Sequence, residues 1–550
     1  MTYWLSSKVF ELFKNNKSFG DIYDARQGLA TGDNNKFLRY WWEVDFSKIF
    51  FDAKSIEESM TSGCKWFPYN KGGSFKRWYG NHEYIVNWES DGCEIRNFFG
   101  ENGKLLSRPQ NTKYYFKPSI SWSDINTSYN SFRYYPHGFI HDATGHSAFN
   151  WNENEKRIAL AFCNNKLASE LISALNPTIH FHIGYFNALP YVQNLIDADL
   201  SHVDELITLM KLDYDSRETS REFSLCLASH DSEKISDWFR NKLALNELHI
   251  NSVQSLEKKN NEITLEACGL LDVYGTDLDE KEISIEKITA CDIAVNIVSL
   301  SVGCMLGRFL LKKGNDALQD KVKFNLEFYN SKEEEIFYQI DEDGIIPLTD
   351  KEWFKDDATN RFREFVQVVW GEEHLQENLD FVAESLCLNA IKPKKSELAL
   401  ETIRRYLSTQ FYKDHLKTYK KRPIYWLFSS GKQKAFECLV YLHRYNEGTL
   451  SRMRTEYVTP LLGKYDAYAE QLEKQIETAD STSEANRFKK ELDALIKKQV
   501  ELREFDDKLK HYADMRISLD LDDGVKVNYG KFGDLLADVK AITGSAPEVN

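Results

Sequence analysis

The sequence predicts an α+β protein with several domains, on three observations. Hydrophobic residues make up 42% and aromatic residues 13% of the 550 positions, which is enough apolar surface for folded cores. The first third of the chain alternates Gly, Asn and Ser turns with short aromatic or β-branched runs, which is typical of strands and loops. Most of the remainder has apolar residues three and four positions apart, which indicates helices. We expect a mixed α/β domain at 1–190, a helical spacer at 191–320, a mainly helical C-terminal domain at 321–450, and a helical hairpin with a terminal β-hairpin at 451–550.

The mixed domain opens with a predicted amphipathic helix over 1–17, whose apolar residues recur at helical spacing. Strands and loops follow over 18–160. Helical periodicity returns over 156–175 and stops before Asn176-Pro177, because proline disfavours helical backbone in the residue before it. The segment TIHFHIGYF that follows is predicted to be a strand.

Helices dominate the chain beyond residue 190. A short strand-and-turn segment interrupts them at 322–348, and the apolar run 424–428 is expected to fill a core. An antiparallel helical hairpin is predicted over 452–478 and 484–512, and the tail ISLDLDDGVKVNYGKF is predicted to be a β-hairpin turning at Asp523-Gly524. The other predicted helices are 192–212, 231–262, 285–312, 350–388, 395–420 and 431–446.

Several classes of protein are excluded by composition. The least polar run, 293–311, contains Asn296 and Arg308, so it predicts a buried helix rather than a membrane span. The N-terminus has no basic segment before an apolar core, so no signal peptide is expected. The nine cysteines include no CxxC pair, which favours reduced thiols. We expect a soluble, cytoplasmic protein with no membrane partner.

Charge is distributed unevenly along the chain. Residues 1–190 contain 21 Lys and Arg against 19 Asp and Glu, a net charge of +2. Since the whole chain carries −15, the remaining residues carry −17. Eight of the twelve tryptophans also lie within 1–190. Only this first region has a charge balance suited to a polyanionic partner.

Known catalytic and metal-binding patterns are absent from the sequence, which contains no GxxxxGK[ST], HExxH, GxSxG or EF-hand loop. We therefore predict no catalytic residues and no metal site. The possible metal ligands are interpreted as ordinary turn or strand residues; these are His137, His141, Asp142 and His146, the pair His180 and His182, and the aspartates 520, 522 and 523.

Three segments have the composition of a nucleic-acid surface. ARQGLATGDNNKF turns sharply and presents amides, and CKWFPYNKGGSFKRWYGN and NTKYYFKPSISWS combine cations with aromatic rings and contain no acidic residue. The alternative interpretation is cation–π pairing and lysine stems lying over exposed strands. The cation-rich segment 411–446 is a second such surface, a docking surface for a partner, or part of a core. The candidate contact residues are Arg26, Gln27, Gly28, Thr31, Gly32, Asn34, Lys36, Lys65, Lys71, Lys76, Arg77, Trp78, Lys113, Lys117, Ser119, Trp122, Ser123, Arg133 and Tyr134.

These segments also carry a resemblance. GLATGDNNKFLRYWWEV, KWFPYNKGGSFKRWYGN, SWSDINTSYNSFRYYPHGFIHDATG and LNPTIHFHIGYFNALPY resemble, in this order, the target recognition domain of PglX-type adenine-specific DNA methyltransferases of the phage-growth-limitation and BREX defence systems. The resemblance continues through SVGCMLGRF, DGIIPLTDKEWF, HLKTYKKRPIYWLFSSGKQKAFECLVYLHRY and DGVKVNYGKFGDLL, and so covers nearly the whole chain.

The resemblance implies sequence-specific recognition of double-stranded DNA by residues 1–190. Lys65, Lys71, Lys76, Lys113 and Lys117 would contact phosphates, and the base edges would be read by Arg26, Gln27, Asn34, Arg77, Ser119, Ser123 and Arg133. One feature departs from the family, because the chain has neither a cofactor loop nor an Asn-Pro-Pro-Tyr/Phe motif; its only Asn-Pro, at 176–177, continues with Thr-Ile.

The chain is therefore expected to be the C-terminal half of such an enzyme, as a fragment or as a subunit of a split system. It would hold no cofactor itself, and S-adenosylmethionine would bind the missing catalytic domain. The expected partners are DNA, that catalytic domain in the same or a separate chain, and other BREX proteins. Two alternatives remain open: a scaffold that docks other defence proteins and binds DNA weakly, and a nuclease or autonomous methyltransferase with an unrecognised motif.

Overall fold

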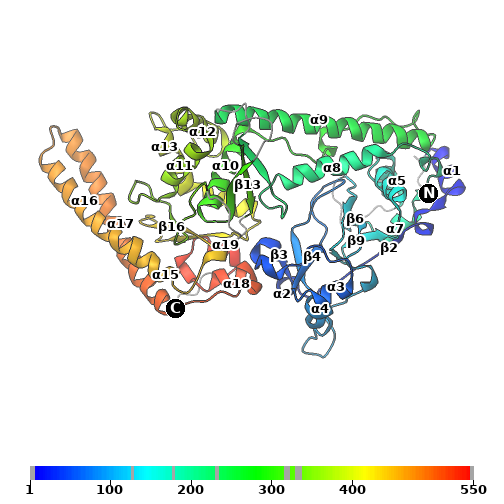
Figure 1. Ribbon diagram of the computed structural model, residues 1–550, viewed down its shortest axis with the longest axis horizontal. Coiled ribbons are helices and arrows are strands. Elements are labelled where there is room, and N and C mark those ends of the chain that lie inside the picture. The colour runs from blue at the N-terminus through cyan, green and yellow to red at the C-terminus, as the bar shows by residue number, and fades with distance from the viewer. Residues whose placement is uncertain are drawn as a thin grey trace. The chain divides into compact units, whose positions relative to one another are not determined.

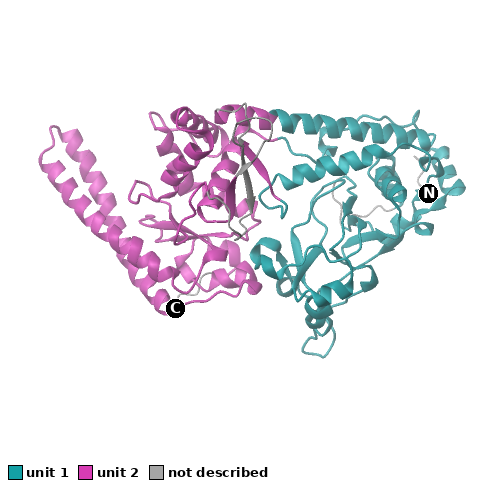
Figure 2. Cartoon of the chain, viewed as in Figure 1, with its two compact units in different colours: residues 1–222, 244–287 teal, residues 223–243, 288–550 magenta. Residues whose placement is uncertain are grey.

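The computed structural model describes residues 6–124, 129–175, 180–228, 234–314, 323–328 and 337–545. These residues form two compact units (Figure 2). Unit 1 comprises residues 1–222 and 244–287, and unit 2 comprises 223–243 and 288–550. The helix α9 (Ile235–Ala267) contributes residues to both units, so unit 1 is discontinuous in sequence.

Unit 1 contains the predicted mixed domain together with α8 and most of α9 (Figure 1). The first predicted helix is confirmed as α1, with Val9 and Leu12 buried. The helices of unit 1 are α1 (Ser7–Asn15), α2 (Asn34–Phe37), α3 (Ile56–Thr61), α4 (Glu89–Arg96), α5 (Glu153–Cys163), α6 (Lys166–Leu175), α7 (Ile183–Ala188) and α8 (Ser201–Asp215). Its strands are β1 (Lys17–Ser18), β2 (Asp24–Arg26), β3 (Leu38–Tyr40), β4 (Trp66–Asn70), β5 (Tyr84–Asn87), β6 (Ser119–Ser123), β7 (Arg133–Tyr135), β8 (Ile140–His141), β9 (Gly145–Phe149) and β10 (Pro190–Tyr191).

Two four-stranded sheets organise unit 1. The first has the order β2-β9-β6-β7 and is antiparallel throughout; the second has the order β3-β5-β4-β8, in which β8 runs parallel to β4. In the first sheet Trp122 pairs with His146 across β6 and β9. Between residues 119 and 149 the chain adds β6, β7 and β9 to the first sheet and β8 to the second. The two sheets that carry the predicted contact segments are therefore connected within this stretch.

The cores of unit 1 contain many of the aromatic residues that the sequence places near cations. Beneath the first sheet, Trp78 and Trp122 pack with apolar residues of α5 and α8. Beneath the second, Trp88 packs with Phe67 and Phe116. These three indoles are at most 2% exposed, so they stabilise the fold through buried apolar area rather than offering faces for stacking.

Unit 2 is mainly helical, and the predicted α+β class of the chain is confirmed. Its helices, besides the start of α9, are α10 (Ala290–Met305), α11 (Ala358–Trp370), α12 (Leu375–Asn389), α13 (Ala399–Thr409), α14 (Phe411–Thr418), α15 (Thr449–Arg452), α16 (Thr459–Glu477), α17 (Thr482–Asp514), α18 (Gly524–Gly530) and α19 (Val539–Thr543), with a π-helical turn at Met453–Val458. Its strands are β11 (Leu225–Ala228), β12 (Phe309–Gly314), β13 (Lys323–Phe328), β14 (Ile345–Pro347), β15 (Tyr425–Ser429) and β16 (Glu437–Tyr441), in sheets of order β11-β13-β12 and β14-β16-β15.

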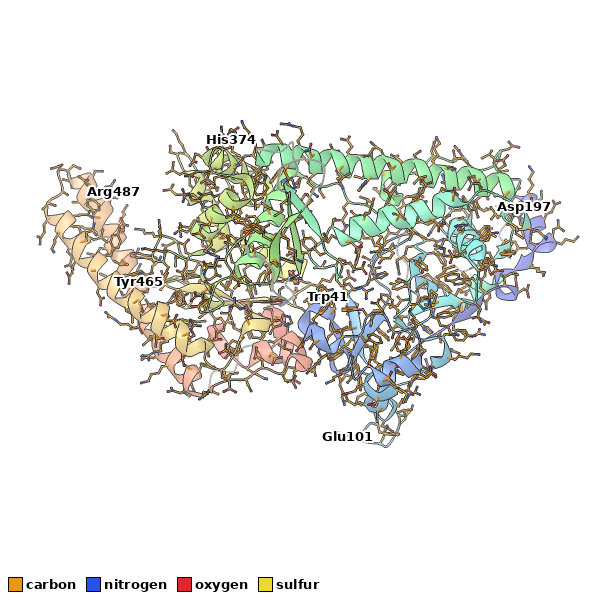
Figure 3. The ribbon with its side chains drawn as sticks, in the orientation of Figure 1. Trp41, Glu101, Asp197, His374, Tyr465 and Arg487 are labelled. Carbon is orange, nitrogen blue, oxygen red and sulfur yellow. The ribbon has the colours of Figure 1, made fainter. Side chains whose placement is uncertain are left out.

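The predicted helical hairpin is confirmed as α16 and α17, which pack along each other (Figure 1). Its base belongs to the core of unit 2, because Tyr465 and Leu502 are fully buried there. Its far end, near Arg487, is exposed (Figure 3). In α17, the buried Leu495, Leu502 and Leu509 are seven residues apart, and they face α16 and the core.

Helix α10 confirms that the least polar run of the chain is a buried helix, since twelve of its residues are buried. It is shorter than the predicted 285–312, and the chain continues as strand β12. Among the described residues, no helix combines the length and the apolar character needed to cross a bilayer.

Three other predicted elements are wrong. Residues 431–446 contain strand β16, not a helix; four of its five residues are buried, and a strand buried on both faces lacks the alternation that identifies strands. The described part of TIHFHIGYF contains helix α7, while Thr178 and Ile179 lie outside the described residues. The tail forms a 3₁₀ turn (Leu521–Asp523) and α18 rather than a β-hairpin.

Candidate nucleic-acid interface

The first predicted segment meets the start of the third, together with the residues just before it, on the surface of unit 1. Ala30 and Arg108 form an antiparallel bridge, with amide-to-carbonyl distances of 3.1 and 2.8 Å. The Asn111 side chain adds a hydrogen bond to the Gln27 carbonyl at 2.9 Å, and the Gln110 side chain donates to the Gly28 carbonyl at 3.3 Å. Residues separated by about 80 positions are thereby held together by backbone and amide contacts.

A cation cluster forms where these segments meet, and we name it the Tyr114 cluster after the ring at its centre. Arg26, Lys113 and Lys117 place their charged groups 5.6, 5.0 and 5.6 Å from the centroid of the Tyr114 ring. Cations at these distances are attracted by the ring quadrupole. Both lysines are exposed, and the Arg26 side chain is 37% exposed.

One carboxylate accompanies the three cations. Asp24 accepts a hydrogen bond from the Tyr114 hydroxyl at 2.9 Å and pairs with Arg26 at 3.0 Å. The Tyr114 cluster therefore keeps an excess of two positive charges on exposed side chains. Such an arrangement suits binding of phosphate groups, because exposed cations release condensed counterions when they approach a nucleic acid.

Backbone geometry explains both glycines of the first segment. A Cβ atom at Gly28 would lie 1.8 Å from the carbonyl oxygen of His141 in β8, so only glycine fits at this close approach of two backbones. Gly32 has φ of 77°, a left-handed conformation that glycine adopts without strain. Thr31 is buried and donates to the Asn34 side-chain oxygen at 2.7 Å, which fixes the turn. Asn34 itself is exposed on α2, where Lys36 pairs with Glu94 at 2.9 Å.

The lysines of the second segment have partners within unit 1. Lys71 lies 2.8 Å from the Asp142 carboxylate, and Lys76 donates to the Ser284 carbonyl at 2.8 Å. Burial lowers the pKa of Lys76. Lys65 is half-buried, with its ammonium 5.6 Å from the Trp66 ring. These contacts match the alternative interpretation, in which lysines of this segment pair with groups of their own chain.

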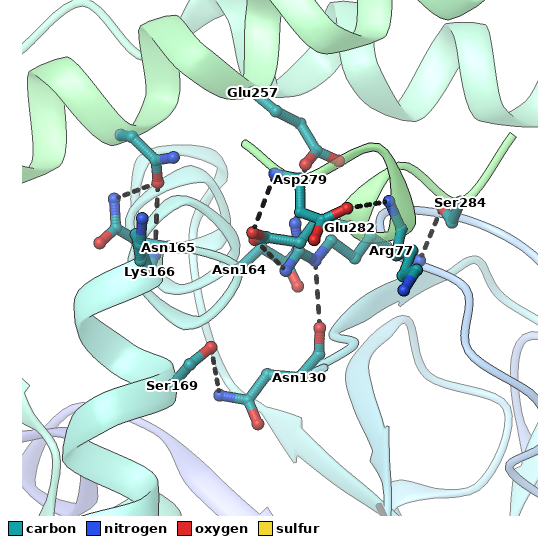
Figure 4. Close-up of polar contacts among 12 residues, drawn as sticks. Arg77, Asn130, Asn164, Asn165, Lys166, Ser169, Glu257, Asp279, Glu282 and Ser284 are labelled. Atoms are coloured by element: carbon teal, nitrogen blue, oxygen red, sulfur yellow. Dashed lines mark hydrogen bonds and ion pairs between the residues drawn. The ribbon is translucent and has the colours of Figure 1, made fainter. Parts of the chain in front are cut away.

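Arg77 and Trp78 lie in the interior around the carboxylate of Glu257. Figure 4 shows Arg77 among Asn130, Glu257, Glu282 and Ser284. The Arg77 guanidinium lies 2.7 Å from one oxygen of Glu257, and the Trp78 indole donates to the other at 2.8 Å. Burial raises the pKa of Glu257, and Arg77 opposes that rise. Glu282 lies 3.6 Å from the same guanidinium. Direct contact between Arg77 and a DNA base would therefore require these packed segments to open.

Arg133 is also fully buried and holds loops of unit 1 together. Its guanidinium donates to the Lys76 carbonyl and the Ser123 hydroxyl, both at 3.2 Å, and to the Ser131 hydroxyl at 3.3 Å. Ser119 and Trp122 are buried in β6, Ser123 is half-buried, and Tyr134 lies half-buried with the Lys156 ammonium 5.3 Å from its ring. The structure thus separates the predicted residues into an exposed group around Tyr114 and a buried supporting group.

Tyr114 was not among the candidate residues, although the sequence places it between the two lysines. Its neighbour Asp24 carries no signal in the sequence, because it reaches the ring only through the pairing of β2 with β9. The sequence offered one signal for Tyr114, namely its position between two lysines in a segment without acidic residues.

Comparison with known proteins identifies the class to which the chain is related. No protein-family model matches it. Along its whole length, however, it is homologous to part of curated adenine-specific methyltransferases.

Two of these relatives define the relation more closely. The chain is 45% identical over 568 residues to the adenine-specific methyltransferase BrxX of Escherichia coli O9:H4 (strain HS). This alignment covers 100% of the present chain and 45% of BrxX. The chain is 35% identical over 562 residues to the adenine-specific methyltransferase PglX of Lacticaseibacillus casei (strain Zhang), covering 99% of this chain and 45% of that protein. The resemblance to PglX-type BREX methyltransferases is confirmed, and the chain spans a little less than half the length of these relatives.

Proposed function

We propose that this chain recognises a specific double-stranded DNA sequence for an adenine-N6 DNA methyltransferase of a BREX phage-defence system. The observation that carries the proposal is the Tyr114 cluster, which gathers three cations from two separate segments on one exposed surface. Homology to adenine-specific methyltransferases supports DNA as the ligand of that surface.

The Tyr114 cluster would contact the phosphate backbone and set the register of the protein on the duplex. Arg26 and Lys113 come from elements tied together by hydrogen bonds, so little conformational entropy is lost when they bind. The side-chain amides of Gln27 and Asn34, both in the first of these segments, have the donor and acceptor groups that read base edges in the major groove. The buried Arg77 and Arg133 would hold the neighbouring segments of unit 1, at Lys76, Ser123 and Asn130, in place.

Methyl transfer would be supplied by the part of the enzyme that this chain does not span. S-adenosylmethionine and the flipped adenine would bind there, since the present sequence has no cofactor loop and no Asn-Pro-Pro motif. This chain would then position the catalytic domain over the target base. Other BREX proteins are further partners under this proposal.

The test measures DNA binding by the full chain, with fluorescence anisotropy as the readout, at a series of salt concentrations. Replacing Arg26, Lys113 and Lys117 together with alanine should weaken binding and lower the log–log salt slope by about 2–3, at about 0.9 per phosphate contact. The matched control replaces Lys489, Lys490 and Lys497 with alanine, three exposed lysines of α17, and should leave the slope unchanged. A wild-type slope in the Tyr114-cluster variant would contradict the proposal.

A second candidate function is a scaffold that docks other defence proteins. It is favoured by the net charge of −17 beyond residue 190 and by the exposed far end of the α16–α17 hairpin. Methylome sequencing separates the two functions. Cells with this chain alone, with the catalytic half alone and with both should methylate a defined sequence only with both, whereas a scaffold would leave methylation by the catalytic half unaltered.

A further inference from the structure

Three histidines and one aspartate converge in unit 1 at a place that the DNA-recognition proposal does not use. Asp124 directly follows β6, His146 lies on the neighbouring strand β9, and His180 and His182 precede α7. One oxygen of Asp124 lies 3.3 Å from His146 Nε2 and 3.0 Å from His182 Nδ1, and the other lies 2.9 Å from His180 Nδ1. The nearest ligand atoms of Asp124, His146 and His182 all lie within 4.8 Å of one another.

Contacts other than those of the imidazoles hold these segments in place. The Asp124 amide donates to the Thr144 carbonyl at 2.9 Å, and the Phe181 amide donates to the Asp124 carbonyl at 2.6 Å. The Trp122 indole donates to the Phe181 carbonyl at 3.0 Å. The ligand atoms are therefore brought together by the fold, and an ion entering the cluster would find its ligands already positioned.

The distances match those of a metal centre. In a tetrahedral zinc site with bonds of about 2.0–2.1 Å, neighbouring ligand atoms are about 3.3 Å apart, which is close to the two distances from Asp124. Imidazole and carboxylate ligands suit Zn²⁺ and neighbouring divalent transition metals.

Two of the four side chains are shielded from water and the other two are open to solvent, which a metal site needs for stable bonds and for entry of the ion. The side chains of His146 and Asp124 are 1% and 11% exposed, which shields the metal-ligand bonds from water. The side chains of His180 and His182 are 44% and 56% exposed, so an ion can enter from their side.

We propose that Asp124, His146 and His182 bind one divalent transition-metal ion, with Zn²⁺ as the expected ion, and that His180 orients the carboxylate through its second oxygen. A solvent molecule would complete a tetrahedral site. The ion would join the end of β6, strand β9 and the start of α7 at one point. By joining these segments the ion would stabilise unit 1, whether or not unit 1 recognises DNA.

The order of residues along the chain does not reveal this cluster. His146 lies near His137 and His141 in the sequence, and His180 and His182 form a separate pair. The antiparallel pairing of β6 with β9 instead brings His146 beside Asp124. Asp124 was absent from the candidates because nothing in its local sequence distinguishes it.

The test measures metal binding by the full chain after a chelator has been added and then removed by dialysis. Titration with ZnCl₂ in a calorimeter should show one equivalent bound, and CoCl₂ should give the intense visible absorption of tetrahedral Co²⁺. Zinc should also raise the thermal transition temperature. His182→Ala should abolish stoichiometric binding, and because this side chain is half-exposed the variant should fold, which circular dichroism would verify. His180→Ala should weaken binding by about 10–100-fold, as expected for a group that orients a ligand.

The matched control is His137→Ala, which removes an exposed histidine of the same unit and should bind zinc as the wild type does. Asp124→Asn gives a second loss-of-binding variant that keeps the shape of the side chain. Absence of stoichiometric zinc and cobalt binding by the wild type would show that the four residues form only a hydrogen-bonded cluster, and equal binding by the His182 and His137 variants would place the ion elsewhere. Either result overturns the proposal.

Discussion

Replacing Arg77 with methionine should destabilise unit 1 rather than merely remove a surface charge. The guanidinium lies 2.7 Å from Glu257, and both side chains are at most 3% exposed. Methionine fills a similar volume but leaves the Glu257 carboxylate buried without its cation. Breaking a buried ion pair in this way costs about 3–5 kcal/mol of unfolding free energy.

A second substitution separates charge from packing. In the double variant with Glu257→Gln, the uncharged amide keeps an oxygen that accepts the Trp78 indole hydrogen bond, so only part of one buried polar group is left unpaired. The unfolding free energy of the double variant should then be only about 1–3 kcal/mol below that of the wild type. Urea unfolding followed by tryptophan fluorescence is a suitable assay, because eight of the twelve tryptophans lie within residues 1–190.

Arg240→Met is the matched control. Arg240 also forms an ion pair from α9, with Asp237 at 2.9 Å, but its side chain is 74% exposed, so its loss should cost about 0–1 kcal/mol. The reasoning would be refuted if Arg77→Met unfolded at the wild-type urea concentration and lowered the salt slope of DNA binding by about 0.9, because that result would mean that Arg77 reaches a phosphate.

Two further predictions concern a tight backbone contact and a buried carboxyl group. Gly28→Ala should destabilise the protein by about 1–3 kcal/mol in urea unfolding, because its Cβ would overlap a carbonyl oxygen, whereas Gly184→Ala, with open space around it, should not. Burial and the neighbouring Asp343 raise the pKa of Asp341 to about 7, so the folded state holds this proton more tightly than the unfolded state does, and the contribution of Asp341 to stability falls as pH rises from about 4 to about 7. Asp341→Asn should therefore raise the unfolding temperature more at pH 8 than at pH 5, and the exposed Asp480→Asn should show no such difference; equal shifts at both pH values would contradict the assignment.

Periodicity predicted the elements whose two faces differ in burial. The α16–α17 hairpin and α11 to α14 each have one apolar face, and the buried helix α10 was identified by its composition. Strand β16 was missed because it is buried on both faces, and α18 because the dipeptide Asp523-Gly524, which is also common in hairpin turns, here joins a 3₁₀ turn to a helix.

The sequence predicted which segments are rich in cations, but not which of those cations face solvent. Segments without acidic residues predicted an uncompensated positive surface. Arg77, however, has its carboxylate partner 180 residues further along the chain, where no local pattern reveals it. Lys113 and Lys117 are exposed, and the acid near their ring, Asp24, pairs with Arg26.

The passage of α9 through both units has a consequence for synthesis of the protein. Unit 1 needs Glu257 from this helix to neutralise Arg77, and Val253 and Leu265 from the same helix lie in its core. At about 5–20 residues per second, a ribosome takes on the order of ten seconds or more to produce the residues between Arg77 and Glu257. During that interval the nascent unit lacks both the carboxylate that neutralises Arg77 and the apolar side chains that α9 contributes to its core. A fragment that ends at residue 190 would lack these α9 residues altogether, so we expect it to be less stable than unit 1 of the full chain.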